Sequence, residues 1–269
     1  GSPSLGQPSA ITGDAGTSLT FEGGTDYINI PSTDATNLQS TEPFTIEFWA
    51  KSTSVSDGTI LRKINDAGSY RGYGMSMLAN GTIRVTLISV WASNVLRYDS
   101  NDSFNDGNWH HFVITYDGSQ SSTGLHLYVD GIWRAGSYGY DTLSDTISNT
   151  EPLYVGMEAP STSPFIGSLD EFAIYDEVMS FADIAEHYQY GASGVTPETY
   201  PEIVKSMMPS AYLRLGEPES TAVAADEMGN HDFTFNALGA TQGTPGLLVG
   251  DNDTSTTFVG NTADYANST

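Results

Sequence analysis

Bulky apolar side chains alternate with polar ones along short segments in the first two thirds of the chain. Clear examples are residues 44–51 (FTIEFWAK), 82–88 (TIRVTLI), 110–116 (HHFVITY) and 125–129 (LHLYV). Because alternate side chains of an extended chain point to opposite faces, each segment predicts a β-strand with one apolar face. Such a face is buried only by packing on another layer, so the pattern favours two sheets packed face to face.

Turn-forming dipeptides mark the ends of these strands. They are Asn80-Gly81, Asp106-Gly107, Asp117-Gly118 and Asp130-Gly131. Glycine, asparagine and aspartate adopt the positive φ angles of tight hairpins at low cost. The spacing of strands and turns predicts antiparallel hairpins over residues 18–175, arranged as a β-sandwich.

The pattern predicts one helix, which begins at Ser180 and runs through Tyr188. Ser180 is a favourable N-cap, Asp183 lies near the positive end of the helix dipole, and Gly191 is expected to stop the helix. Residues 192–201 are rich in Gly, Ser, Thr and Pro and therefore indicate a linker. The sequence thus predicts an all-β domain in residues 1–191, built as a two-sheet antiparallel sandwich with one short C-terminal helix.

The residues beyond the linker repeat the start of the chain. The matching pairs are 243–251 with 6–14, 257–260 with 20–23 and, after one inserted residue, 264–265 with 26–27. The first two pairs share an offset of 237 residues, for example Gly250 against Gly13. Residues 202–269 are therefore expected to open a second repeat within a longer tandem array.

This later segment lacks the central strands that a sandwich core requires. Because its apolar residues need a surface on which to be buried, we expect it to dock on the first domain. The strand around Tyr212 to Leu215 is predicted to pair with an exposed edge of the first domain's sheet.

The chain is strongly acidic, with 33 acidic residues against 9 basic ones and a formal net charge of −24. Nucleic acids and anionic lipids are bound chiefly through Lys and Arg, so neither is an expected partner. The absence of cysteine excludes disulfides and thiolate metal sites. No apolar run reaches the roughly 18 residues of a membrane-spanning helix, so no membrane insertion is expected.

Several short motifs occur in a fixed order along the chain. They are residues 21–31 (FEGGTDYINIP), 44–50 (FTIEFWA), 109–118 (WHHFVITYDG), 127–131 (LYVDG) and 167–175 (GSLDEFAIY), followed by the predicted helix. Over residues 10–191 they make the chain similar to the laminin G-like, concanavalin A-like jelly-roll family. Residues 211–217 (AYLRLGE) resemble the first strand with which bacterial and phage members open a repeat. The resemblance implies two curved antiparallel sheets, with binding in the rim loops or on the concave sheet.

Aromatic residues in segments that contain Gly, Ser and Asn are the candidate ligand contacts. They are Tyr70, Tyr73, Trp91, Tyr98, Tyr138 and Tyr140. An exposed ring can stack on the apolar face of a pyranose, while nearby Asn, Asp and Arg side chains bond its hydroxyls. The alternative is that these rings only stabilise loops. We expect Trp91 or the segment Tyr138 to Tyr140 to form part of any sugar platform.

The resemblance also implies a structural calcium ion at the rim of the sandwich. In related jelly rolls a carboxylate and backbone carbonyls supply its oxygen ligands. Asp170 is the candidate ligand, with Asp26 and Glu22 in the matching rim segment. The alternative is that Asp170 accepts backbone hydrogen bonds in a turn.

The sequence predicts binding without catalysis. Glycosidases place two carboxylates so that both face the sugar, whereas Ser168 precedes Asp170 by two positions and Glu171 points to the opposite face. The expected function is therefore a non-catalytic binding module, carbohydrate-binding or adhesive, in an extracellular or cell-surface tandem-repeat protein whose partners are glycans or surface proteins. The alternative is a structural spacer or decoration domain of a phage or viral virion, with no ligand of its own.

Overall fold

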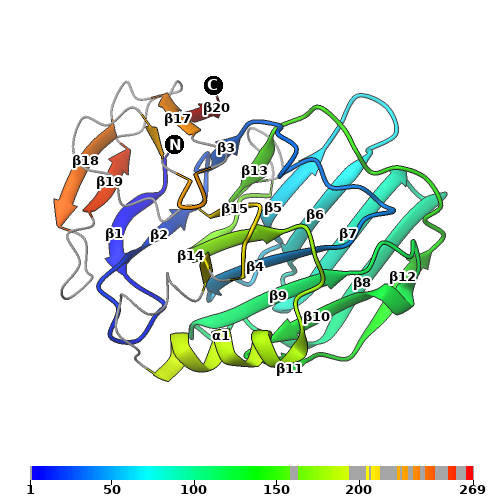
Figure 1. The fold of residues 1–269 in the computed structure, drawn as a ribbon, viewed down its shortest axis with the longest axis horizontal. Coiled ribbons are helices and arrows are strands. Elements are labelled where there is room, and N and C mark those ends of the chain that lie inside the picture. The colour runs from blue at the N-terminus through cyan, green and yellow to red at the C-terminus, as the bar shows by residue number, and fades with distance from the viewer. Residues whose placement is uncertain are drawn as a thin grey trace.

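Two antiparallel sheets face each other across an apolar core, and a helix lies along the outside of one sheet (Figure 1). The computed structural model describes residues 2–157, 163–193, 204–205, 207–212, 223–224, 226–229, 233–236, 240–245, 254–258 and 265–268. The two-sheet all-β sandwich with one helix, predicted from the alternation of side chains, is confirmed.

Sheet A contains, in order of pairing, β1 (Ser4–Pro8), β2 (Thr17–Glu22), β14 (Ile166–Tyr175), β4 (Phe44–Lys51), β9 (His110–Tyr116), β10 (Leu125–Val129) and β11 (Ile132–Trp133). One further strand, β15 (Ala211–Tyr212), pairs with β14. Sheet B contains β12 (Gly136–Asp141), β8 (Asn94–Ser103), β7 (Thr82–Val90), β6 (Gly72–Met77), β5 (Gly58–Ile64), β13 (Leu153–Val155) and β3 (Ile28–Ile30).

The remaining elements are the helix α1 (Phe181–Ser193), the 3₁₀ turn η1 (Ser122–Gly124), and the strands β16 (Val223–Ala224), β17 (Phe233–Asn236), β18 (Ala240–Pro245), β19 (Thr254–Phe258) and β20 (Tyr265–Ser268). β16, β17 and β20 form one small sheet, and β18 and β19 form a hairpin. β19 contacts β1, and β20 contacts β3, at one end of the sandwich (Figure 1).

Side-chain alternation gives β4 two different buried faces. Phe44, Ile46 and Phe48 point into the core between the sheets. Trp49 points the other way, under α1, where it packs in a second apolar cluster with Ile184. The helix therefore covers the outer face of sheet A, which makes β4 buried on both sides.

The helix begins where the sequence predicts and ends later. The Ser180 hydroxyl accepts a hydrogen bond from the Asp183 N–H over 3.3 Å, as an N-cap does. Gly191 was expected to stop the helix, but α1 continues to Ser193. Gly191 instead allows close packing, because a Cβ at this position would lie 2.3 Å from the Trp49 ring. No helix in the described part of the chain is long and apolar enough to cross a membrane.

A buried carboxylate, Glu47 on β4, ties three elements together. Its Oε1 atom is 2.7 Å from His111 Nε2 on β9 and 2.7 Å from His187 Nδ1 on α1. Its Oε2 atom accepts a hydrogen bond from the Tyr175 hydroxyl over 2.8 Å. Burial by itself would raise the pKa of Glu47, but the two histidines outweigh burial and hold that pKa well below its usual range. Glu47 is therefore an anion that anchors the helix to the sheet.

We expect Glu47→Gln to lower the free energy of unfolding by about 3–5 kcal/mol, because one partner of a buried ion pair is removed. Urea unfolding at pH 7, followed by tryptophan fluorescence, measures this change. Glu177→Gln is the matched control, since Glu177 is exposed and surface changes usually stay within about 0.5 kcal/mol. Equal losses for the two variants would contradict the anchoring role.

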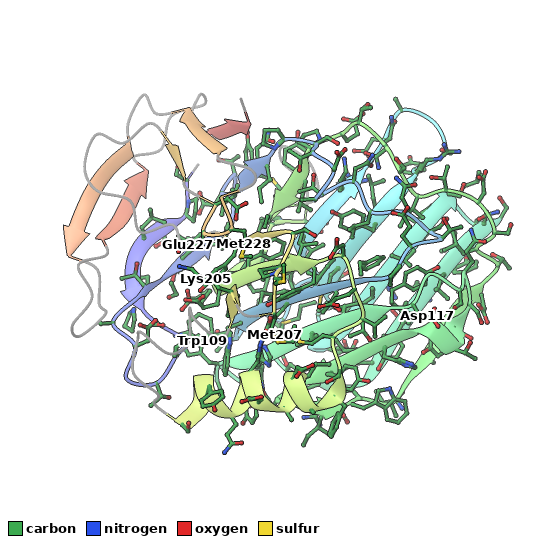
Figure 2. All side chains as sticks on the ribbon, viewed as in Figure 1. Trp109, Asp117, Lys205, Met207, Glu227 and Met228 are labelled. Atoms are coloured by element: carbon green, nitrogen blue, oxygen red, sulfur yellow. The ribbon has the colours of Figure 1, made fainter. Side chains whose placement is uncertain are left out.

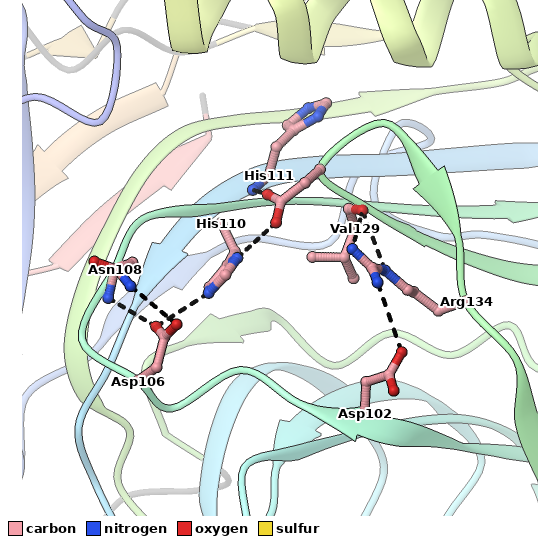
Figure 3. A network of polar contacts seen from close by, with 8 residues as sticks. Asp102, Asp106, Asn108, His110, His111, Val129 and Arg134 are labelled. Atoms are coloured by element: carbon pink, nitrogen blue, oxygen red, sulfur yellow. Dashed lines mark hydrogen bonds and ion pairs between the residues drawn. The ribbon is translucent and has the colours of Figure 1, made fainter.

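A second polar network lies where β9, β10 and β11 meet the segment after β8 (Figure 3). His110 lies between two carboxylates, with Nδ1 2.7 Å from Asp130 and Nε2 3.1 Å from Asp106. Arg134 donates to the Val129 carbonyl over 3.0 Å and pairs with Asp102 at 3.6 Å. Burial lowers the pKa of His110, but Asp130 and Asp106 outweigh it, so that pKa lies above its ordinary value.

A raised pKa means that the folded state binds a proton at His110 more tightly than the unfolded state does. The network therefore contributes its full stability below the ordinary histidine pKa and loses it as the pH rises through the folded-state pKa. We expect His110→Gln to cost more unfolding free energy at pH 6 than at pH 9, as measured by urea unfolding at both values. The same substitution in an Asp106→Asn, Asp130→Asn background is the control and should lose this difference. A cost independent of pH in the unmodified background would contradict the charged network.

The predicted domain boundaries lie partly outside the described residues. The helix includes residues 192 and 193, so the first domain extends two residues into the predicted linker, and residues 194–201 are not described. Of the strand predicted around Tyr212 to Leu215, Ala211 and Tyr212 pair with β14, and residues 213–215 are not described. The assignment of residues 202–269 to a second repeat stays a prediction.

Candidate functional site

The outer face of sheet B carries a trough of about 380 Å³ over β5, β6 and β7. Its lining residues are Asp57, Gly58, Thr59, Leu61, Arg62, Ile64, Tyr70, Gly74, Ser76, Leu78, Arg84, Thr86, Ile88, Trp91 and Ser163. α1 packs on the outer face of sheet A, whereas the trough leaves the outer face of sheet B accessible to a ligand.

The strand register explains why these side chains share one face. One row across the sheet contains Tyr154, Arg62, Gly74, Thr86, Arg97 and Tyr140, each opposite the next. In the adjacent row Ser76 lies opposite Arg84, which lies opposite Asp99. The strand β6 contributes only the small residues Gly74 and Ser76 to this face, whereas β5 and β7 contribute longer side chains. The small residues therefore form the floor of the trough, and the longer side chains form its walls.

Two aromatic rings border one end of the trough. Trp91 is 46% exposed and Tyr70 is 44% exposed. Tyr70 belongs to the turn between β5 and β6, and Trp91 to the turn between β7 and β8. The Trp91 N–H donates to the Ser69 carbonyl over 2.8 Å, which holds the two turns together. Rings from separate hairpins therefore lie at one cavity.

Tyr140 extends this aromatic surface. Its ring centroid lies 6.1 Å from that of Trp91. The Arg97 guanidinium lies over the Tyr140 ring, 5.3 Å from the ring centroid. Tyr140 stands on β12, a strand rather than a loop, directly opposite Arg97. The structure thus brings together Trp91, Tyr70 and Tyr140 from the predicted set.

Ion pairs hold the guanidinium groups of the trough in place. Arg84 Nε lies 2.7 Å from Asp99, and Arg97 lies 3.1 Å from the other oxygen of the same carboxylate. Arg62 pairs with Asp66, with Nη1 2.9 Å from Oδ2. At least one side chain of each pair is largely shielded from solvent, and the pairs fix the direction of the N–H donors. In a chain with only 9 basic residues, this face concentrates hydrogen-bond donors.

The arginines of the trough were not identified from the sequence. The available signal was the alternation in residues 82–88, where Arg84 and Thr86 occupy the positions between core residues. That pattern shows that the two side chains share a face with each other. It does not show that Arg62 from β5 and Arg97 from β8 join them, since this depends on the pairing of strands.

Tyr73 and Tyr98 were predicted as ligand contacts, and for these two the prediction is wrong. Both are buried in the core between the sheets. The Tyr73 hydroxyl donates to the Thr36 carbonyl over 2.7 Å, and the Tyr98 hydroxyl donates to the Arg134 carbonyl over 2.8 Å. Their positions alternate with those of the trough residues, so they face inward. Burial raises the pKa of both hydroxyls.

Tyr138 lies on the same strand as Tyr140 but does not line the trough. A bulge between the two residues places Tyr138 opposite Tyr98, and the two rings meet edge to face at 5.5 Å. The Tyr138 hydroxyl donates to the Leu125 carbonyl over 2.8 Å. Tyr138 therefore fastens the edge of sheet B to β10, as the alternative reading of these aromatics expected.

Asp170 is half-buried at the start of a bulge in β14. Its Oδ2 atom accepts hydrogen bonds from the Ala10 N–H at 2.8 Å and the Ser9 hydroxyl at 3.0 Å. Its Oδ1 atom accepts the Glu171 N–H at 3.1 Å. Burial, together with the charge of Asp14, raises the pKa of Asp170 to about 7 despite these bonds. Asp170 thus accepts backbone hydrogen bonds, and its neighbouring carboxylate is Asp14.

The predicted grouping of Asp170 with Asp26 and Glu22 is wrong. Glu22 lies opposite Ile166, four positions from Asp170 along β14, or about 13 Å at the rise of an extended strand. Asp26 accepts the Glu22 N–H over 3.1 Å, at that same distant end. In the described part of the chain, no group of three His, Asp or Glu side chains could hold a metal ion. Calcium at Asp170 stays a prediction.

If calcium binds at Asp170 only in the folded state, chelation must lower the melting temperature. A site saturated to 100 times its Kd stabilises by about 2.7 kcal/mol. Thermal melts with EDTA and with excess calcium measure the effect, which Asp170→Asn should abolish and the control Glu22→Gln should preserve. Identical melting temperatures of the unmodified chain under the two conditions would contradict calcium binding.

A family model described as the concanavalin A-like lectin/glucanases superfamily matches residues 22–185, which include the strands from β3 to β14 and the start of α1. A comparison with curated protein sequences found no match.

Two solved structures are similar in fold. The binding domain of Paraclostridial Mosquitocidal Protein 1 superposes with a TM-score of 0.52 at 15% identity, over 69% of this chain and 51% of that one. A putative carbohydrate binding protein from Bacteroides ovatus superposes with a TM-score of 0.50 at 20% identity, over 78% of this chain and 56% of that one. The chain thus spans about half the length of each, and at these identities the likeness shows the fold alone.

Proposed function

Because the chain belongs to the concanavalin A-like lectin/glucanase superfamily, we propose that it is a binding module that takes a carbohydrate in the trough on the outer face of sheet B. One observation carries the proposal. Two exposed rings, Trp91 and Tyr70, border a trough whose lining also includes the hydrogen-bonding side chains of Arg84, Ser76 and Thr86. This combination of a flat apolar surface with oriented donors is what a sugar ring requires.

The chemistry of the trough matches a sugar in three respects. Its volume of about 380 Å³ falls in the range of about 300–1,000 Å³ that is usual for small-molecule sites. A pyranose has an apolar face of C–H groups that can lie on Trp91 or Tyr70. Its hydroxyls can accept hydrogen bonds from Arg84, and they can both donate to and accept from the hydroxyls of Ser76 and Thr86.

The acids near the trough support binding rather than catalysis. Asp99 is engaged by Arg84 and Arg97, and the Asp57 carboxylate accepts the Ala79 N–H over 2.7 Å. The proposal therefore assigns these acids no catalytic step.

The similar structure from Bacteroides ovatus is that of a putative carbohydrate binding protein, which agrees with this proposal, although the likeness itself concerns the fold. The strongly acidic chain, with a net charge of −24, fits a neutral glycan better than a polyanionic partner. A place outside the cell, on a glycan or a surface protein, is part of the same proposal.

A purely structural role is the second candidate. The repeated hairpin at the two ends of the chain, Ser4–Glu22 and Ala240–Phe258, favours a place in an array, where a domain can act as a spacer. A spacer needs no trough, so the ligand experiment below separates the two functions.

We expect Trp91→Ala to weaken carbohydrate binding at least tenfold, or by about 1.4 kcal/mol or more, because the stacking surface is lost. A glycan array on the whole chain first identifies a binding sugar, and titration calorimetry then compares the variants. Trp133→Ala is the matched control, since Trp133 is 52% exposed on β11, outside the trough. Equal affinity of the Trp91→Ala variant and the unmodified chain, or no glycan bound at all, would contradict the proposal.

A further inference from the structure

The hairpin of β18 and β19 reproduces the hairpin of β1 and β2. Pro8 pairs with Thr17, and Pro245 pairs with Thr254, exactly 237 residues later in each strand. Gln7 with Ser18 and Thr244 with Ser255 repeat the agreement. Both hairpins also carry a register shift just before these pairs. Sequence and backbone pairing therefore agree independently that a second repeat begins in this part of the chain.

The third strand of the repeat is present as well. β20 begins at Tyr265, which matches Tyr27, and its Asn267 matches Asn29 on β3. Both pairs are 238 residues apart, because one residue is inserted before them. β15 stands between α1, the last element of the first domain, and this repeated set. Its place in the chain thus assigns β15 to the second repeat.

The packing of β15 assigns it to the first domain instead. Ala211 and Tyr212 pair with Ile174 and Ala173 on β14, and the Ser210 N–H donates to the Ile174 carbonyl over 2.8 Å. β2 pairs with β14 only as far as Leu169. Beyond the bulge, β14 pairs with β4 along one edge. Without β15, the backbone groups of its other edge would be unpaired and would form an open sheet edge.

Tyr212 is the anchor of this contact. It is fully buried in the apolar cluster under the helix, with Trp49 and Ile184. Its hydroxyl donates to Glu171, and its N–H donates to the Asp226 carboxylate over 2.8 Å. A side chain of the second repeat thereby completes the same cluster that holds α1 on sheet A.

Neighbouring residues strengthen the contact. Figure 2 shows Lys205, Met207, Glu227 and Met228 over sheet A. Lys205 forms an ion pair with Glu227, and the Glu227 N–H donates to the Tyr212 carbonyl over 2.7 Å. Met207 and Met228 pack against the cluster that contains Tyr212. The contact therefore involves the described residues between 204 and 228 and not β15 alone.

We propose that the edge of β14 at Ala173 and Ile174 is an acceptor site for the opening strand of the following repeat. The occupant is the segment 204–229, which belongs to the second repeat in sequence and to the first domain in packing. Adjacent repeats are then joined by a shared strand, as in other cases of strand addition to a sheet edge. Such a joint fixes the direction of one repeat relative to the next, which a flexible linker does not.

The test uses the whole chain and a fluorescent peptide of residues 202–229. In the unmodified chain the site is filled by its own strand, whereas Tyr212→Ala should weaken that strand and admit the peptide. We expect the Tyr212→Ala chain to bind the peptide at least tenfold more tightly than the unmodified chain. A peptide that itself carries Tyr212→Ala should not bind. A chain with Met208→Ala, which removes a side chain that is 74% exposed, should behave as the unmodified chain does.

Two results would overturn the proposal: no peptide binding by a Tyr212→Ala chain that circular dichroism shows to be folded, or equal binding by that chain and the unmodified one. Should the variant not fold, hydrogen exchange on the unmodified chain decides. The amides of Ser210, Tyr212 and Glu227 must then exchange as slowly as those of β4, and exchange at the rate of an unstructured peptide would refute the shared strand.

Discussion

The attachment of α1 to sheet A through Glu47 is the interaction on which the rest of the structure depends. Glu47 can be buried because His111, His187 and Tyr175 occupy its oxygens, and a buried carboxylate without such partners would be strongly unfavourable. Once the helix lies there, Trp49 and its neighbours form a second core. The parts of β4, β9 and β14 that carry this cluster are then covered on their outer face, whereas the trough lies on the outer face of sheet B.

The open face of sheet B differs from a stabilising surface in its composition. β6 contributes small side chains to this face, and the arginines on β5, β7 and β8 are each held by a carboxylate. These ion pairs fix the direction of the guanidinium donors that face the trough. The aromatic rings at the end of the trough supply the apolar part of the same surface.

The strand β15 contributes Tyr212 to the cluster that holds α1 on sheet A. The proposed contact between repeats therefore shares this cluster with the contact between helix and sheet. This arrangement joins the two proposed functions. The binding face on sheet B remains free, because the joint between repeats lies on the opposite sheet and at its edge. An array built this way can present each trough at a fixed orientation.

By itself the sequence determined the fold class and the position of the helix start, and it predicts an internal repeat. These features are local: alternation has a period of two residues, a cap needs only a few neighbours, and a repeat is visible without any contact. The sequence also offered Trp91 and Tyr70 as candidates, because aromatic residues in polar turns tend to stay exposed, and Tyr140 together with them. It could not separate them from Tyr73 and Tyr98. Only the tertiary structure decided which rings face outward, which arginines join them and which acid lies beside Asp170, because register and pairing between distant strands determine these contacts.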